Sequence, residues 1–258
     1  MAIIGSGPAG VYAAGALSQH GGTATDVFDR LPCPFGLVRY GVAPDHPKIK
    51  SISLTLRKLL EDPAVRFLGN VEVGEQLTLD DLRRYYDAVI FSQGSAVDRR
   101  LGIPGEDLPG SYSATEFVAW YSAHPDAPID GFTLDARSVA VIGVGNVAVD
   151  VARILAKTAD DLRPTDLPDH VLAVLERSQV EDIYVIGRRG PAQAKFTTLE
   201  LRELGDVGNI DVIVDPADLE LDEVSRKVVE TEPMMRRNLE VMTEWSRRTP
   251  QGRPRRLH

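Results

Sequence analysis

The chain has 258 residues and a formal net charge of −9, with 43% apolar and 26% charged residues. These values are typical of a globular protein with one large or two ordinary domains, and the acidic balance argues against a nucleic-acid partner. A single cysteine, Cys33, excludes a disulfide framework and favours a reducing, cytoplasmic compartment, and no apolar run approaches the ~18 residues of a membrane span.

The first 29 residues predict a strand, a glycine-rich turn, a helix and a second strand that ends in an acidic residue. Gly5 permits a sharp turn, Gly7 leaves room for a pyrophosphate beside the backbone, and Gly10 lets the helix approach the sheet. A carboxylate at the end of the second strand can accept hydrogen bonds from ribose hydroxyls. The pattern predicts a dinucleotide site, and a glycine-rich turn of another α/β protein is the alternative. The expected contacts are Gly5, Gly7, Pro8, Ala9, Gly10 and Asp29.

Residues 31–47 combine many prolines and glycines with apolar side chains, which predicts an ordered loop without regular helix or strand. A flavin ring is one expected neighbour of this loop, and the core of the protein itself is the other. Residues 49–60 then predict one helix with Ile49, Ile52, Leu56 and Leu59 on a single face.

Three elements are expected to complete the first nucleotide-binding half. Residues 65–73 predict a hairpin of two short strands around Gly69 and Asn70. Thr78 is the expected N-cap of a helix that continues to Tyr86, and residues 88–94 predict a buried strand.

Residues 31–50 resemble the signature loop of adrenodoxin-reductase-type ferredoxin-NADP reductases, which are flavoenzymes. The similarity continues through the linker at residues 102–110 and extends to about Asp218. It implies that FAD binds a domain at residues 1–102, with Leu37 in the loop and the backbone of Val73 beside the adenine. The family usually has glutamate at the position of Asp29, so the shorter side chain must reach farther to the ribose.

A second dinucleotide motif begins after the strand at residues 138–142. Alanine at position 148 is an accepted variant of the third glycine. Two such motifs predict two nucleotides, which for a flavoprotein means FAD beside NAD(P). The expected contacts are Gly143, Val144, Gly145, Asn146 and Val147, and the resemblance implies that residues 145–147 lie at the pyrophosphate. Val144 stands where the family more often has a polar residue.

The strand at residues 182–187 ends in Arg188 and Arg189 instead of an acid. Guanidinium groups attract the 2′-phosphate of NADP, whereas a carboxylate would repel it, so the pattern favours NADP over NAD. A solvated basic turn is the alternative. The resemblance also implies an NADP-binding domain at residues 103–258 and places Glu200 near the nicotinamide half.

The resemblance implies that His46 and Glu203 lie by the active site, where they could relay protons to the reduced flavin. A loop-stabilising histidine and a solvated helix carboxylate are the alternative. Arg202, Arg236 and Arg237 stand where the family is thought to present positive charge to an acidic ferredoxin, and solvated helix faces are the competing interpretation. No metal site is expected.

The rest of the chain gives weaker patterns. An insertion at about residues 157–181 predicts one helix near residues 170–175, residues 210–214 predict a strand, and residues 233–247 predict a helix. Residues 249–258 read as a polar, arginine-rich stop. The family's later tryptophan- and glycine-rich segment has no counterpart here, so we expect an N-terminal fragment whose FAD and NADP domains are both incomplete.

These observations predict an α/β protein with two Rossmann-like, glutathione-reductase-like domains. The expected activity is hydride transfer from NADPH to FAD, followed by single-electron transfer to a ferredoxin. Two alternatives stay open. One is the electron-input subunit of a glutamate-synthase-like enzyme, although its cysteine-rich cluster region is absent. The other is a truncated, non-catalytic nucleotide-binding module.

Overall fold

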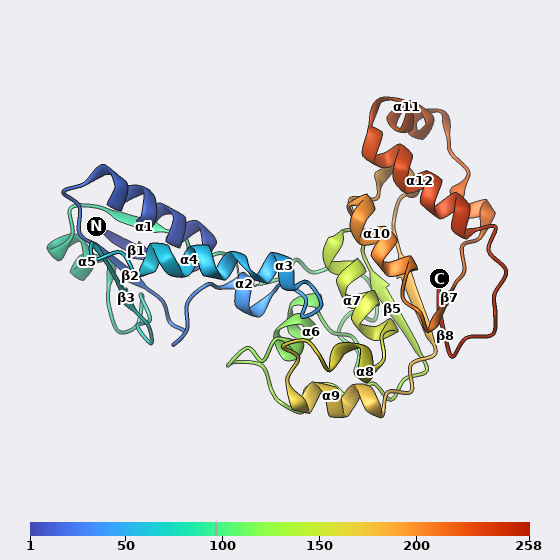
Figure 1. Ribbon diagram of the computed structural model, residues 1–258, viewed down its shortest axis with the longest axis horizontal. Helices are drawn as coiled ribbons and strands as arrows, with labels where there is room; N and C mark the ends of the chain where they lie inside the picture. The colour runs from blue at the N-terminus through green and yellow to red at the C-terminus, as the bar shows by residue number, and fades with distance from the viewer. Residues whose placement is uncertain (96) are drawn as a thin grey trace. The chain divides into compact units, whose positions relative to one another are not determined.

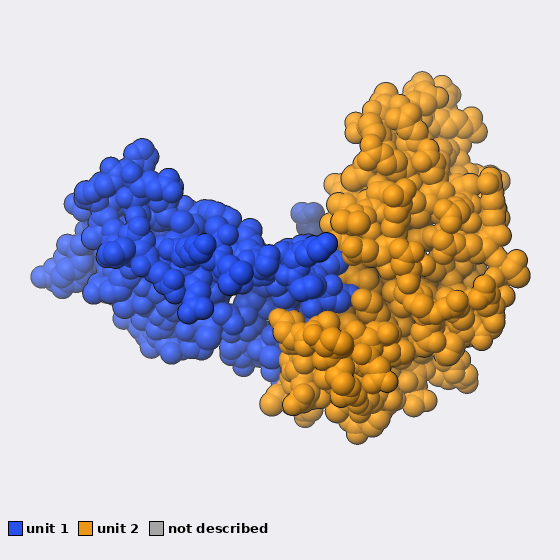
Figure 2. All heavy atoms as spheres, viewed as in Figure 1, with its two compact units in different colours: residues 1–128 blue, residues 129–258 orange. Residues whose placement is uncertain are grey.

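The computed structural model describes residues 1–95 and 97–258. The chain forms two compact units, unit 1 at residues 1–128 and unit 2 at residues 129–258 (Figure 2). Each unit carries its own parallel sheet with helices packed on it (Figure 1). The expected boundary between nucleotide-binding domains at residue 102 stays a prediction.

The sheet of unit 1 has the order β3-β2-β1-β4, and every neighbouring pair is parallel. Its strands are β1 (Ala2–Ile4), β2 (Thr25–Phe28), β3 (Val65–Leu68) and β4 (Val89–Phe91). Successive side chains of a strand point to opposite faces. Accordingly, Ile4 packs with Phe28 on one face, whereas Ile3 packs with Val27 and Ala14 on the other. Both faces of this sheet are therefore buried.

The helices described in unit 1 are α1 (Pro8–His20), α2 (Leu37–Tyr40), α3 (Pro47–Lys50), α4 (Ile52–Leu60), α5 (Leu79–Tyr85) and α6 (Ala114–Tyr121). Helix α1 starts with proline in its first turn and ends at two glycines with positive φ, which are preferred residues at the two ends of a helix. The expected cap of α5 is confirmed, because the Thr78 hydroxyl accepts from the Asp81 amide and the Asp81 carboxylate accepts from Thr78 in return.

Three expectations for unit 1 are wrong in detail. Residues 65–73 form no hairpin: Asn70 takes φ 58°, and the Val71 amide then donates to the Asp29 carbonyl at the end of β2. The helix expected at residues 49–60 is divided at Ser51, whose hydroxyl bonds the Lys48 carbonyl. The predicted loop at residues 31–47 contains the helical turn α2.

The burial expected for two of these segments also needs correction. In the helix face predicted at residues 49–60, Leu56 is buried, whereas Ile49 and Ile52 are exposed. The strand expected at residues 88–94 is β4, which is an edge strand and leaves Phe91 half exposed. Apolar spacing therefore indicated helix and strand in the right segments but overstated how much of each is buried.

The sheet of unit 2 has the order β5-β6-β8-β7, again parallel throughout. Its strands are β5 (Ser138–Ile142), β6 (Asp182–Ile186), β7 (Ile210–Val212) and β8 (Arg255–Leu257). The helices are α7 (Asn146–Ala156), α8 (Ala159–Leu162), α9 (Asp169–Glu176), α10 (Thr198–Gly205), α11 (Glu223–Thr231) and α12 (Pro233–Trp245), with 3₁₀ turns η1 (Pro191–Gln193) and η2 (Pro216–Leu219). Helix α10 contacts both α7 and α12.

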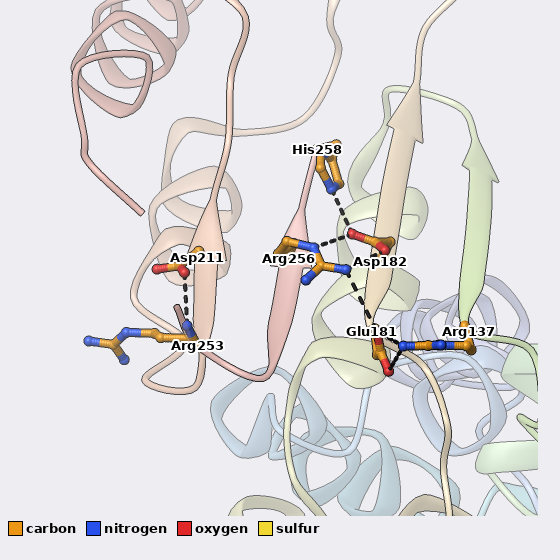
Figure 3. A network of polar contacts seen from close by, with 7 residues as sticks. All are labelled: Arg137, Glu181, Asp182, Asp211, Arg253, Arg256 and His258. Atoms are coloured by element: carbon orange, nitrogen blue, oxygen red, sulfur yellow. Dashed lines mark hydrogen bonds and ion pairs between the residues drawn. The ribbon is translucent and has the colours of Figure 1, made fainter. Parts of the chain in front are cut away.

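Strand β8 overturns the expectation of a polar stop at residues 249–258. Arg255 is buried and its guanidinium donates to the carbonyls of Leu155, Ala156 and Lys157 at the end of α7. Arg256 makes two hydrogen bonds, of 2.5 and 2.6 Å, to Asp182 on the adjacent strand (Figure 3). The arginines therefore attach β8 to the rest of unit 2, and the segment is an ordered strand.

Protonation of Asp182 is expected to weaken unit 2 in acid. Hydrogen bonds from Arg256 and His258 hold the pKa of Asp182 well below its usual value. A carboxyl with a lower pKa in the folded state stabilises the fold above its unfolded pKa of about 4, and this contribution is lost as the pH falls below that value. In urea unfolding of unit 2, Asp182→Asn should therefore lose less stability than the wild type between about pH 5 and about pH 3. The exposed Asp218→Asn is the matched control, and an acid loss in Asp182→Asn equal to that of the wild type would contradict this assignment.

Candidate dinucleotide-binding sites

The first glycine-rich turn connects β1 to α1 in unit 1. Gly5 has φ +103°, and a Cβ there would lie 2.6 Å from the Ser92 carbonyl oxygen. A Cβ on Gly10 would lie 2.0 Å from the Gly5 carbonyl oxygen, so only glycine allows the helix to come this close. By contrast, a Cβ on Gly7 would meet nothing within 4 Å. The Cβ position of Gly7 thus faces open space in which a pyrophosphate could lie.

Asp29 supports this turn from the end of β2. One carboxylate oxygen accepts from the Ser6 amide at 2.8 Å and from the Ser6 hydroxyl at 2.5 Å, and the other accepts from the Leu31 amide at 2.9 Å. Because an ionised carboxylate has about four lone-pair sites, these bonds leave acceptor capacity for a ribose hydroxyl. Asp29 therefore orders the glycine turn, and its contact with ribose stays a prediction.

The loop at residues 31–47 lies directly on the same turn. The Phe35 amide donates to the Ser6 carbonyl at 2.9 Å, and a Cβ on Gly36 would lie 3.0 Å from the Cα of Gly7. Phe35 and Val38 are buried with Val11 of α1. Leu37 is 71% exposed, so it is available to a bound group. The loop is thus ordered by the glycine turn.

Two further contacts hold this loop and the residue before it in unit 1. Within the loop, Tyr40 packs edge-on against the His124 ring at 4.9 Å, and Arg30, which precedes the loop, forms a 2.5 Å ion pair with Asp126. Val73, the expected neighbour of the adenine, packs on the apolar cluster that contains Ile4 and Phe28.

The second glycine-rich turn connects β5 to α7 in unit 2. Gly143 has φ +146° and donates to the Ile186 carbonyl at 2.9 Å, whereas a Cβ on Gly145 would meet nothing within 4 Å. Helix α7 begins at Asn146, so its first amides face the turn. The two turns therefore share two features: a first glycine at positive φ and a second glycine whose Cβ position is open.

Arg188 and Arg189 follow β6, the neighbour of β5 in the sheet, and both are exposed. In parallel strands the carboxyl ends meet at one edge, which is where open α/β sheets bind their ligands. Val144 connects the two ends, because a Cβ on Gly187 would lie 2.8 Å from its Cγ1 atom. The geometry thus brings the arginine turn beside the second glycine turn.

Comparison with known proteins accounts for this double arrangement. Residues 1–187 match the family model described as pyridine nucleotide-disulphide oxidoreductase. The chain belongs to this family.

Relatives within the family agree with the match. NADPH-ferredoxin reductase FprA of Mycobacterium leprae is 48% identical over the whole chain, and mitochondrial NADPH:adrenodoxin oxidoreductase of Arabidopsis thaliana is 42% identical over 94% of it. A solved structure of Mycobacterium tuberculosis FprA in complex with NADPH matches 99% of the chain with a TM-score of 0.93 and 46% identity. The predicted fold class is confirmed. The chain spans 58% of the FprA proteins and 50% of the plant relative.

Glu200, expected near a nicotinamide in this oxidoreductase family, has a clear structural partner. It is 8% exposed and accepts from the guanidinium of Arg153 at 3.1 Å, and Arg153 is itself buried and also pairs with Asp150. These bonds attach α10 to α7 behind the second glycine turn. The contact of Glu200 with a nucleotide stays a prediction.

His46 and Glu203 belong to different units, so their expected pairing stays a prediction. His46 is half-buried, and its amide donates to the Ala43 carbonyl at 3.1 Å just before α3. Arg202, Arg236 and Arg237 are exposed on α10 and α12. Within residues 1–95 and 97–258, no helix is both long and apolar enough to cross a membrane.

Several residues that build these sites in the oxidoreductase fold were not predicted from the sequence. The Ser6 side chain is buried under the first turn, and the Ser92 hydroxyl donates to the carbonyls of Ile4 and Gly5. Ser92 follows β4 directly, so a small polar residue at the carboxyl end of a strand adjoining a glycine turn was an available signal. Arg153 gave none, because a charged residue on an amphipathic helix is normally assigned to solvent.

Proposed function

We propose that the protein containing this chain is an NADPH-dependent ferredoxin reductase, which transfers a hydride from NADPH to FAD and then single electrons to a ferredoxin. The observation that carries the proposal is the pair of open glycine turns, one in each unit, with an arginine pair beside the second. FAD, when bound, accepts two electrons and releases them one at a time. The names of the FprA and adrenodoxin oxidoreductase relatives support this activity.

Unit 1 would hold FAD and unit 2 would hold NADPH. The residues that follow the second strand of each motif support this assignment. Asp29 suits an adenosine ribose without a phosphate, whereas Arg188 and Arg189 suit a 2′-phosphate. Helix α1 would direct its N-terminal amides to the FAD pyrophosphate, and α7 would do the same for NADPH. Glu200 and the loop at residues 31–47 would then lie toward the reacting rings.

An anaerobic titration of the full-length protein tests this proposal. With FAD bound, NADPH should bleach the flavin absorbance rapidly and NADH slowly, and an acidic ferredoxin should then reoxidise it. If Arg202, Arg236 and Arg237 form the docking surface, reoxidation should slow as ionic strength rises. Flavin that stays oxidised in NADPH would contradict the proposal and favour a non-catalytic nucleotide-binding module.

We propose the cytoplasm as the location, because a chain with the single cysteine Cys33 is typical of a reducing compartment. The rival assignment, an electron-input subunit of a glutamate-synthase-like enzyme, would be favoured if the flavin, once reduced by NADPH, were not reoxidised by ferredoxin.

We further propose that His46, with Glu203, relays protons to the reduced flavin. A histidine has a usual pKa of about 6.5, so it can gain and lose a proton near neutral pH. His46→Ala should lower kcat by about tenfold or more, as for loss of a proton-transfer group, with little change in NADP⁺ affinity. The exposed His20→Ala is the matched control. Unchanged steady-state turnover in His46→Ala would contradict this role.

A further inference from the structure

The segment between the arginine turn and α10 crosses the second glycine turn. We call residues 194–198, which end at the first residue of α10, the strap. The Lys195 amide donates to the Val144 carbonyl at 2.7 Å, and the Thr197 amide donates to the Asn146 side-chain oxygen at 2.8 Å. The strap therefore binds the glycine turn on both sides of Gly145.

The bond from Thr197 also fixes how the Asn146 amide is oriented. Thr197 N–H is a donor, so the Asn146 oxygen must face the strap and its NH₂ group must point the other way. Asn146 is exposed at the start of α7, where an NH₂ donor suits a phosphate oxygen. A displaced strap would let this amide rotate and present its oxygen to the phosphate instead.

Asn238 of α12 holds the strap from the opposite side. Its side chain is 0% exposed, its nitrogen donates to the Phe196 carbonyl at 2.9 Å, and its oxygen accepts from the Thr198 hydroxyl at 2.6 Å. The Phe196 carbonyl can only accept, which determines the orientation of this amide. Burying an amide without such partners is costly, so Asn238 requires both bonds. They hold the strap against α12 at Phe196 and Thr198.

The hairpin of α11 and α12 is therefore connected to the nucleotide turn. Helix α12 packs on α10 and on η1, which precedes the strap, and Gln193 of η1 donates to the Ser225 hydroxyl of α11 at 3.1 Å. Figure 1 shows α10 between α7 and α12. Asn238 of α12 is therefore hydrogen-bonded to the strap, and the strap is hydrogen-bonded to Asn146.

We propose that Asn238 is a positioning residue for a pyrophosphate-bearing nucleotide in unit 2, acting through the strap and Asn146. This inference depends on the proposed function, because it assumes that the second turn binds NADP(H). Asn238 touches no nucleotide in this scheme. It sets the orientation in which Asn146 presents its NH₂ group.

The test measures NADP⁺ affinity by calorimetry and the kcat and KM for NADPH with ferricyanide as acceptor, in the full-length flavoprotein. Asn238→Ala removes two hydrogen bonds and should weaken NADP⁺ binding and raise KM about tenfold, with kcat little changed. Thr198→Val removes one of the two bonds and should show a smaller change of the same kind. Glu240→Ala, exposed on α12, is the matched control.

A double-mutant cycle separates positioning from a general loss of structure. If Asn238 acts through Asn146, then Asn238→Ala should cost little further NADP⁺ affinity in an Asn146→Ala background. Multiplicative losses, or wild-type affinity in Asn238→Ala, would overturn the inference. Should Asn238→Ala fail to fold, Thr198→Val in the same cycle decides by the same criterion. A wild-type protein that does not bind NADP⁺ would instead reject the proposed function.

Discussion

Gly10→Ala is expected to destabilise unit 1 strongly, whereas Gly7→Ala is expected to leave the fold intact and weaken FAD binding. A Cβ at position 10 would lie 2.0 Å from a backbone carbonyl oxygen, and no side-chain rotation relieves a contact with backbone. Overpacking at this severity should cost roughly 3 kcal/mol or more. Thermal unfolding of the full-length apoprotein measures this loss.

Gly7→Ala is expected to change FAD affinity without changing the stability of the fold. Gly7 has φ −68° and ψ 176°, which alanine adopts without strain, and nothing lies within 4 Å of the added methyl group. The apoprotein should therefore unfold at the wild-type temperature. The methyl group would occupy the space of the pyrophosphate, and FAD affinity should fall about 100-fold, or ~2.7 kcal/mol. Wild-type FAD affinity in Gly7→Ala would show that this turn does not bind the pyrophosphate.

The glycine turns were predictable because their constraints are local. Gly5 and Gly143 need positive φ, and Gly10 needs close approach, so residue type and spacing suffice to find them. Pro8 and the Thr78 capping box are also local signals, and helices α1 and α5 begin where those signals predict. What these elements share is that every group needed lies within a few residues along the chain.

Strand β8 was not predictable in this way, because its stabilising partners are distant in the sequence. Arg255 is balanced by carbonyls of α7 about a hundred residues earlier, and Arg256 by Asp182. Read alone, three arginines among ten residues indicate a solvated segment. The hairpin expected at residues 65–73 failed for the same reason, since the Asp29 carbonyl, which accepts from Val71, lies just after β2 and far from Val71 in the sequence.

The site residues show the same difference between local signals and partners that are distant in the sequence. The sequence identified residues by the ligand they could face, such as Asp29, Asn146 and Glu200. It did not identify what each of them binds in the protein, which is Ser6, Thr197 and Arg153 respectively. These partners orient the predicted residues, and only the folded chain brings them together.

Replacement of Arg188 and Arg189 by alanine is expected to remove the preference for NADPH over NADH. Both side chains are exposed at the carboxyl end of β6, next to the strand that carries the second glycine turn. A 2′-phosphate bound there would lose charge-assisted hydrogen bonds worth about 2 to 4 kcal/mol in total, so kcat/KM for NADPH should fall ~30- to 1000-fold. The same constant for NADH should change little, because NADH has a hydroxyl at this position.

A charge-matched control separates this recognition from general electrostatic attraction. Arg177→Ala combined with Arg226→Ala removes the same two positive charges at exposed positions of unit 2, and it should leave both constants near the wild-type values. High salt should reduce the NADPH preference of the wild type but not that of the variant without Arg188 and Arg189, since screening acts only on charges that are present. Equal losses for NADPH and NADH would instead mean that the arginines support the fold of the turn. Only a selective loss assigns them to the 2′-phosphate.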